Sequence, residues 1–139
     1  MANAFYTTAR QHFAQGDLHW KTGGDTFRAA LIDTGAYTVD IATHEYLSSV
    51  PAIARIATAT LTTLTATDGC LDAANVTFTA VAGSTSCEAI IIYQWTGSDA
   101  TSLLVLYLDE ASAGLPVTPA DDADIAVTWD NGSEKIAKL

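Results

Sequence analysis

Short apolar runs of strand length recur along most of the chain, and several of them alternate with polar or threonine positions. Such runs, bounded by Gly, Asn, Asp and Ser, are typical of short β-strands. They predict strands at 26–35, 55–66, 76–81, 87–95, 103–110, 125–129 and 135–139. No helical pattern separates the later strands, which argues against a parallel α/β sheet. The sequence therefore predicts a single, mainly β domain over 1–139: an antiparallel β-sandwich or a small jelly-roll-like barrel of about seven strands, with one or two short N-terminal helices.

Two neighbouring runs, CEAIIIYQW at 87–95 and LLVLYLDE at 103–110, do not alternate. The turn-forming residues between them predict a β-hairpin. A strand with one solvated face should alternate, so both faces of this hairpin are expected to be buried. Ile90 and Ile92 then share one face, opposite to that of Ile91. A second sheet would cover one face, and the N-terminal helix or a neighbouring subunit would cover the other.

Residues 3–15 carry apolar side chains at helical spacing, which predicts one short amphipathic helix. Asn3 would be its N-cap, and Gly16 would end it. Farther along, Asp40 would cap a helical turn, which must end before Pro51 because the residue before proline disfavours the helical conformation. Both helical pieces fall near the N-terminal third of the chain.

A second hairpin signal lies near the C-terminus. Asn131-Gly132 separates the strands predicted at 125–129 and 135–139. Asn and Gly tolerate the positive φ of a type I′ turn, so this dipeptide is the strongest short-range hairpin signal in the chain. The last two strands are therefore expected to pair with each other.

The charge of the chain limits its partners. Six of the 139 residues are Lys or Arg and sixteen are Asp or Glu, which gives a net charge of −10. Proteins bind nucleic acid largely through Lys and Arg contacts to phosphate, so this charge disfavours DNA or RNA binding. The apolar runs are far shorter than the roughly 20 residues of a membrane helix, and the first residues lack the apolar stretch of a signal peptide. We therefore expect neither a nucleic-acid partner nor a membrane partner.

Residues with the chemistry for catalysis or metal binding are scattered. The histidines, His12, His19 and His44, lack the tight spacing of a zinc site. Acidic residues gather near the C-terminus without the spacing of an EF-hand, so a solvated acidic loop is the simpler interpretation. The acidic residues concerned are Asp121, Asp122, Asp124 and Asp130, with Asp109-Glu110 as a further pair. No nucleophile elbow, phosphate-binding loop or Cys–His arrangement is recognisable. The sequence therefore predicts no enzyme, no cofactor and no catalytic, cofactor-binding or metal-ligating residues.

The two cysteines, Cys70 and Cys87, form no CxxC pair. A disulfide between them is one interpretation, but a protein made inside a cell usually keeps such thiols reduced. A pair of buried thiols is the favoured interpretation.

Four stretches of the chain together carry a resemblance to known proteins. They are TFRAALIDTGAYTVDIATHEYLSSVP, VTFTAV, YQWTGSDATSLLVLYLDE and GLPVTPADDADIAVTWDNGSEKIAKL. From Phe5 to Leu139, the chain resembles a family of small virion structural proteins of tailed bacteriophages and prophages. The most specific parts are LIDT…Y…ATHEYLSSVP and the closing GLPVT…IAVTWDNG…KIAKL. The resemblance implies a β-rich, non-enzymatic virion component made in the host cytoplasm. Members are described as capsid decoration or cement proteins and, more loosely, as tail-fibre or minor structural proteins.

Charge helps to choose a location within a virion. Next to packaged DNA, a domain of net charge −10 would be repelled at contact, because screening acts only over about 8–10 Å. The chain also lacks the long repeats of a fibre shaft and the long arm of a tube protein. We therefore expect a capsid decoration protein on the outer surface of the head, bound to the major capsid protein and itself a homodimer or homotrimer.

The N-terminal arm, residues 1–25, is the predicted lattice contact because it is the least sheet-like part of the chain. A helix that simply covers one end of the sandwich is an equally good interpretation of the same residues.

Two other functions remain open. One is a tail- or fibre-associated β module that binds a receptor or glycan, with exposed Trp20, Tyr37 and Tyr46 stacking on sugars. The other is a small cell-wall hydrolase that uses acidic residues such as Asp121 and Asp124.

Overall fold

The computed structural model describes residues 4–81, 83, 85–109, 118, 123–129, 132 and 135–139. These residues form ten β-strands, one α-helix and two short 3₁₀ helices. The strands are β1 (Ala4–Phe5), β2 (Phe27–Ile32), β3 (Arg55–Thr60), β4 (Thr65–Thr67), β5 (Cys70–Asp72), β6 (Val76–Val81), β7 (Ala89–Gln94), β8 (Leu104–Leu108), β9 (Ala123–Val127) and β10 (Ala137–Lys138). The helices are α1 (Thr7–Gln15), η1 (Leu47–Ser49) and η2 (Ala52–Ala54). The predicted fold class is confirmed: a mainly β, sandwich-like protein with a short N-terminal helix.

Five strands form the main sheet, in the order β1-β8-β7-β2-β3. All neighbours in this sheet pair antiparallel. The hairpin predicted from the two apolar runs is confirmed, because β7 pairs directly with β8. β2 lies on the other side of β7, so β7 is the central strand of the sheet. Every residue of β7 except Gln94 is buried, and so is every residue of β8.

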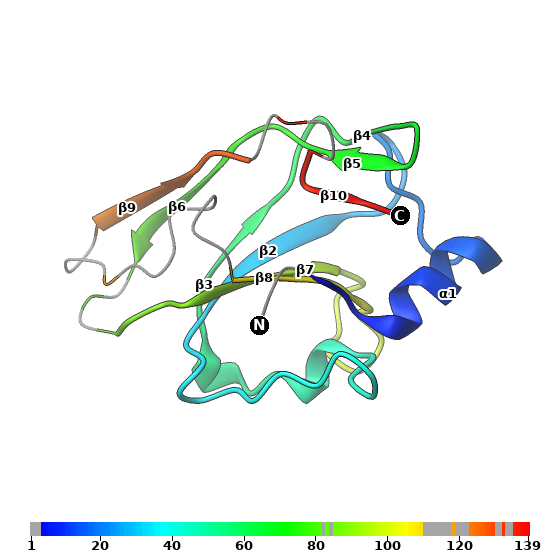
Figure 1. Ribbon diagram of the computed structural model, residues 1–139. Coiled ribbons are helices and arrows are strands. Elements are labelled where there is room, and N and C mark those ends of the chain that lie inside the picture. Colours follow the sequence, from blue (N-terminus) through cyan, green and yellow to red (C-terminus); the bar gives the residue numbers. More distant parts are fainter. Residues whose placement is uncertain are drawn as a thin grey trace.

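Two smaller sheets form the second layer of the sandwich, one with the order β10-β5-β4 and the other with β6-β9. Figure 1 shows both of them above the main sheet. Trp20 links the layers, because its ring lies 4.7 Å from that of Phe27 in β2 and its indole N–H donates to the carbonyl of Asp72 in β5. Leu71 and Phe78 of the second layer are buried in the same apolar core. The core therefore fills the space between the two layers.

Residues 33–54, between β2 and β3, cover the opposite face of the main sheet, and we call them the covering segment. Figure 1 shows them as the cyan and blue-green chain below the sheet. The Asp33 N–H donates to the Ala54 carbonyl and joins the ends of the segment, and the Leu104 N–H of β8 donates to the carbonyl of Glu45. The prediction that the N-terminal helix or a neighbouring subunit covers this face is wrong. Hydrogen bonds to β8 and to the residues just before it hold a connecting segment of the same chain there instead.

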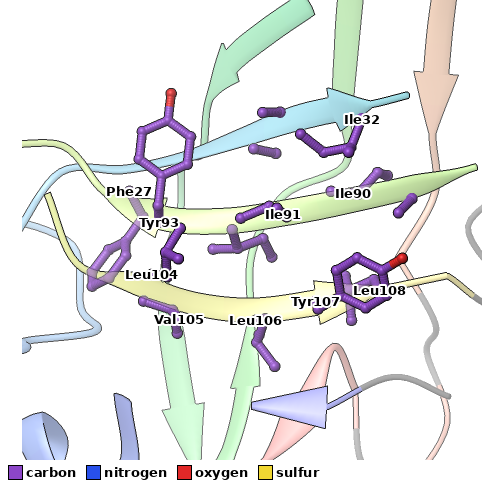
Figure 2. Packing of buried hydrophobic residues seen from close by; sticks show 14 of the residues in the cluster. Phe27, Ile32, Ile90, Ile91, Tyr93, Leu104, Val105, Leu106, Tyr107 and Leu108 are labelled. Carbon is purple, nitrogen blue, oxygen red and sulfur yellow. The ribbon is translucent and has the colours of Figure 1, made fainter. Parts of the chain in front are cut away.

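The register of β7 assigns its side chains to the two faces. Ile90 and Ile92 share a face with Phe27 of β2 and therefore point toward the second layer. Ile91 and Tyr93 point the other way, toward the covering segment. The isoleucines are fully inaccessible to solvent and Tyr93 is 2% exposed. Figure 2 shows Ile90, Ile91 and Tyr93 packed among side chains of β2 and β8. The lack of alternation is thus explained by complete cover within one chain.

Helix α1 begins at Thr7, after Tyr6, which occupies the N-cap position. The predicted N-cap, Asn3, lies outside the described residues. Gly16 ends the helix as predicted, with a φ of 83° that glycine adopts without strain. Figure 1 shows α1 at one end of the sandwich. Among the residues of α1, only Ala9 is fully buried, so the helix contributes little to the apolar core.

The turn predicted at Asp40 is present, but it does not continue into a longer helical stretch. The Asp40 carboxylate accepts hydrogen bonds from the N–H groups of Ala42 and Thr43 and from the Thr43 hydroxyl. These bonds, with that from the hydroxyl foremost, hold the pKa of Asp40 below its ordinary value. The separate helix η1 follows and ends before Pro51, as predicted.

Two predictions about strand pairing and extent are wrong. β9 pairs with β6 and β10 pairs with β5, so the hairpin predicted at Asn131-Gly132 does not form between these strands. Asn131 itself lies outside the described residues. The strand predicted over 55–66 is interrupted between β3 and β4, where Thr63 has a φ of 55°. In the first case long-range pairing outweighs the local turn signal, and in the second β4 pairs with the neighbouring β5 instead of extending β3.

Candidate functional site

A histidine with a carboxylate on each ring nitrogen joins α1 to the covering segment. His12 Nδ1 lies 2.8 Å from Asp17 Oδ2, and His12 Nε2 lies 2.8 Å from Glu45 Oε1 of the covering segment. Burial lowers the pKa of His12, but the hydrogen bonds and charges of the two carboxylates outweigh burial and raise the pKa above its ordinary value. The Thr7 N–H also donates to the Ile41 carbonyl. We call this set of contacts the N-terminal joint.

A chain of hydrogen bonds adds a second polar link to the N-terminal joint. The Tyr37 hydroxyl lies 3.0 Å from the Tyr6 hydroxyl and 2.8 Å from His44 Nδ1. Both tyrosines are buried. Burial raises the pKa of both phenols, so both hydroxyls keep their protons near neutral pH. The start of the chain is therefore fastened to the covering segment by side-chain hydrogen bonds.

An arginine and two aromatic rings meet on the face of the main sheet that carries Tyr93. Arg28 Cζ lies 4.5 Å from the centroid of the Trp95 ring, and the rings of Tyr93 and Trp95 meet edge to face at 6.3 Å. Arg28 is partly exposed in a strand whose other residues are all buried. Its buried Nε has no hydrogen-bond partner in the structure. We call Arg28, Tyr93 and Trp95 the Arg28 corner; on β3, Thr60 lies opposite Arg28 and is exposed.

The neighbouring cation, Arg55, is fully engaged. It donates from Nε and Nη2 to the Val50 carbonyl, at 3.1 and 2.9 Å, and from Nη2 to the Asp99 carboxylate at 2.8 Å. Arg28, by contrast, makes no ion pair with a carboxylate of the described residues. Burial raises the pKa of Tyr93, and the charges of both arginines partly offset that rise. The Arg28 corner therefore presents a positive charge whose planar donors suit a carboxylate.

The structure separates the histidines that the sequence suggested as metal ligands. His12 and His44 take part in the two links of the N-terminal joint. His19 is half-exposed, with Nδ1 3.3 Å from Asp25 Oδ2. Within the part of the chain that the structure describes, no three His, Cys, Asp or Glu side chains are arranged to hold a metal ion.

One member of the acidic cluster has a structural role. Asp124 of β9 accepts a hydrogen bond from the Ala80 N–H at 3.0 Å, across the irregular part of its pairing with β6. This bond satisfies a backbone donor that the ladder leaves free at the irregularity. The other acidic residues considered, Asp121, Asp122, Asp130 and Glu110, lie outside the described residues, and Asp109 is partly buried beyond β8.

The aromatic residues predicted to stack on sugars have different environments. Trp20 is 6% exposed and Tyr37 is 4% exposed. The prediction is wrong for these two, because the core and the N-terminal joint occupy their rings. Tyr46 is 36% exposed and remains accessible.

No disulfide joins the two cysteines, and both are buried, as the favoured interpretation predicts. Burial raises the pKa of the Cys87 thiol to about 11. The thiol therefore stays protonated near neutral pH and is a poor nucleophile.

Sequence reasoning did not identify the Arg28 corner, nor Ile53 of η2, which is 78% exposed. The signal for Arg28 was available: it is the one charged residue within the apolar run of β2. Ile53 lies between two alanines in a stretch without clear periodicity, so no pattern distinguishes it from a core residue.

No family model matches the chain, and no curated protein sequence matches it. Within the described residues, no helix is both long and apolar enough to cross a membrane.

Proposed function

We propose that this chain is a non-enzymatic structural protein of a tailed-phage virion, which decorates the outer surface of the capsid and stabilises the lattice of the major capsid protein. The observation that carries the proposal is the cover of both faces of the main sheet by the same chain. A protein that adds to a finished lattice has to fold before it binds. A subunit of a fibre shaft, in contrast, leaves sheet faces for its neighbours to bury.

The net charge of the chain supports a location on the outer surface of the capsid over one on the inner surface. The net charge of −10 opposes close contact with packaged DNA but favours solubility on an exposed surface. Binding only to the assembled lattice stabilises that lattice by RT ln(1 + [L]/Kd), about 4 kcal/mol at a thousandfold excess over Kd. A homodimer or homotrimer would gain further from the effective concentration of its second contact.

Arg28 and Trp95 of the Arg28 corner, both partly exposed, form the surface we assign to the capsid contact. Trp, Tyr and Arg are the residues most often found at the energetic centre of protein interfaces. A carboxylate from the major capsid protein would pair with the Arg28 guanidinium, which makes no ion pair with a carboxylate of the described residues. The competing assignment, made from the sequence, places the capsid contact on the N-terminal arm. Arg10, on the exposed side of α1, is the residue of that arm chosen for the test.

Cryo-EM of the intact virion tests the location. We expect density for the domain on the outside of the head, at positions related by the capsid symmetry. Density confined to the tail would contradict the capsid assignment and favour the receptor-binding module.

Co-sedimentation with purified capsids tests the contact surface, using Arg28→Gln and Arg10→Gln as matched charge-removing variants. We expect Arg28→Gln to weaken binding by about tenfold or more, as loss of a central interface residue does. Arg10→Gln should bind as the wild type does. The reverse result would return the contact to the N-terminal arm. Thermal melting of both variants separates a binding defect from a folding defect.

Sedimentation velocity tests the oligomeric state. We expect a dimer or trimer at high protein concentration. A monomer at all concentrations would restrict self-association to the capsid surface.

A further inference from the structure

The geometry of His12 points to a pH-dependent latch: its doubly protonated ring holds α1 on the covering segment, and loss of one proton releases the helix. This inference stands independently of the virion assignment. It concerns the N-terminal joint, the one place where α1 meets the covering segment through ionisable side chains of the described residues.

The first step concerns the protons on the ring. Both nitrogens of His12 lie 2.8 Å from carboxylate oxygens, those of Asp17 and Glu45. An ionised carboxylate only accepts hydrogen bonds, and a neutral imidazole has a single N–H. Both bonds therefore form together only when the ring is the imidazolium cation. The cation makes two charge-assisted bonds, whereas the neutral ring turns a lone pair toward one of the carboxylates.

The second step concerns the charges around His12. The covering segment contributes Glu45. The carboxylate of Asp40, in the same segment, instead accepts hydrogen bonds within its own turn. β8, on which α1 packs, has no charged residue and only Tyr107 as an ionisable one. On α1 itself the other charge is Arg10, whose guanidinium lies 5.1 Å from the centroid of the Phe5 ring.

No described cation on these elements competes with His12 for its two carboxylates. His12 also lies in the last turn of α1, where the helix dipole favours a positive charge. His44, the other histidine of the joint, bonds the Tyr37 hydroxyl and needs no positive charge to do so.

Helix α1 depends on the hydrogen bond between His12 and Glu45 more than most helices depend on one side chain. The helix has nine residues, too short to persist alone in water. It buries only Ala9 completely, and Phe13 packs partly against the core. Because α1 buries so little apolar area, the hydrogen bond from His12 to Glu45 supplies a large share of the free energy that keeps the helix in place.

The sign of the pH dependence follows from the raised pKa. His12 has an ordinary pKa of 6.5 and a higher one in the folded protein. The stabilisation from the latch is therefore complete below about pH 6.5, while both carboxylates are ionised, and is lost as the pH rises through the folded-state value. Histidine titrates in the physiological range, and the raised pKa of His12 moves the release of α1 to a pH above the ordinary value of 6.5.

The test uses histidine NMR and amide exchange on the full chain. We expect His12 to titrate at a higher pH in the folded protein than in the urea-unfolded chain. The protection factors of the α1 amides should fall by about tenfold as the pH passes that midpoint, the effect of losing one charge-assisted hydrogen bond. In His12→Gln, α1 should be weakly protected at every pH, and His19→Gln, the matched control, should behave as the wild type.

Two carboxylate variants separate a latch from a helix-end effect. Glu45→Gln removes the partner on the covering segment, and Asp17→Asn removes the partner beside the helix. We expect both to lower the midpoint of His12, but only Glu45→Gln to reduce the protection of α1 markedly. Equal loss of protection in both variants would overturn the latch. So would a folded-state midpoint at or below the unfolded one, or α1 protection that does not change across it.

Discussion

The second layer and the covering segment each cover one face of the main sheet, but they are held in different ways. The second layer is built of paired strands and meets the sheet through apolar side chains such as Phe27, Leu71 and Phe78. The covering segment has no strand of its own. It buries Leu47 and Val50 in the apolar core, and backbone bonds to β8 and polar side chains, among them Tyr37 and Arg55, hold it as well.

This difference follows from where the backbone hydrogen bonds go. Strands satisfy their N–H and C=O groups in a ladder, so their side chains are free to pack as an apolar surface. An irregular segment has no ladder, and its buried polar groups need individual partners. Arg55 supplies one by donating twice to the carbonyl of the buried Val50. The comparison predicts that the second-layer side responds to lost volume and the covering-segment side to lost hydrogen bonds.

The largest effect should come from the second-layer side. Phe27→Ala removes a fully buried ring that contacts Trp20 across the layers. We expect it to lower the free energy of unfolding by about 3–5 kcal/mol, the usual cost of a phenylalanine-sized cavity. Urea denaturation measures this loss. Thr58→Ala on β3, an exposed position, is the control and should change stability by less than about 0.5 kcal/mol. A loss below about 1 kcal/mol in Phe27→Ala would mean that the core refills the cavity.

Arg55→Ala should give the next largest effect, on the covering-segment side. It leaves the Val50 carbonyl without its two donors and Asp99 without its ion pair. We expect the free energy of unfolding to fall by about 1–2 kcal/mol. The loss is smaller than for a fully buried ion pair because Asp99 is 43% exposed. Asp99→Asn removes only the ion pair and should cost less than half as much. If the two variants cost the same, the bonds to Val50 contribute nothing.

The pattern of apolar residues was sufficient to predict the longer strands but neither the short strands β1 and β5 nor the covering segment. The runs that became β2, β6, β7 and β8 are continuous or alternating, and burial on one or two faces follows directly from that pattern. The covering segment has mixed composition, and its position depends on bonds to distant residues, such as that from the Leu104 N–H to the Glu45 carbonyl. No local periodicity encodes such a bond.

The same limit applies to the candidate sites. His12 was noticed as a possible metal ligand, but Glu45 lies 33 residues away and only the fold brings the two together. The Asn131-Gly132 signal was misleading for a related reason: β9 and β10 each find a better partner in β6 and β5 than in each other. Turn propensity is local, whereas the pairing of short strands is decided by the whole core.

A smaller effect is expected from Tyr37→Phe. The substitution keeps the buried ring but removes the hydroxyl between Tyr6 and His44. The buried Tyr6 hydroxyl then loses a partner, which should cost about 1–2 kcal/mol in chemical denaturation. Tyr46→Phe removes a hydroxyl from an exposed ring of the same segment and should be neutral. Equal stability of the two variants would mean that the hydroxyl chain does not help to hold the covering segment.

The smallest effect on stability should come from Ile53→Ser. Ile53 belongs to the covering segment but is 78% exposed, so its apolar side chain gains little from folding. We expect a change within about 0.5 kcal/mol, measured by urea denaturation. A larger loss would mean either that apolar contacts of Ile53 within the chain help to hold the covering segment or that self-association buries Ile53 in solution. Repeating the measurement over a range of protein concentrations separates these outcomes, because only self-association makes the loss depend on concentration.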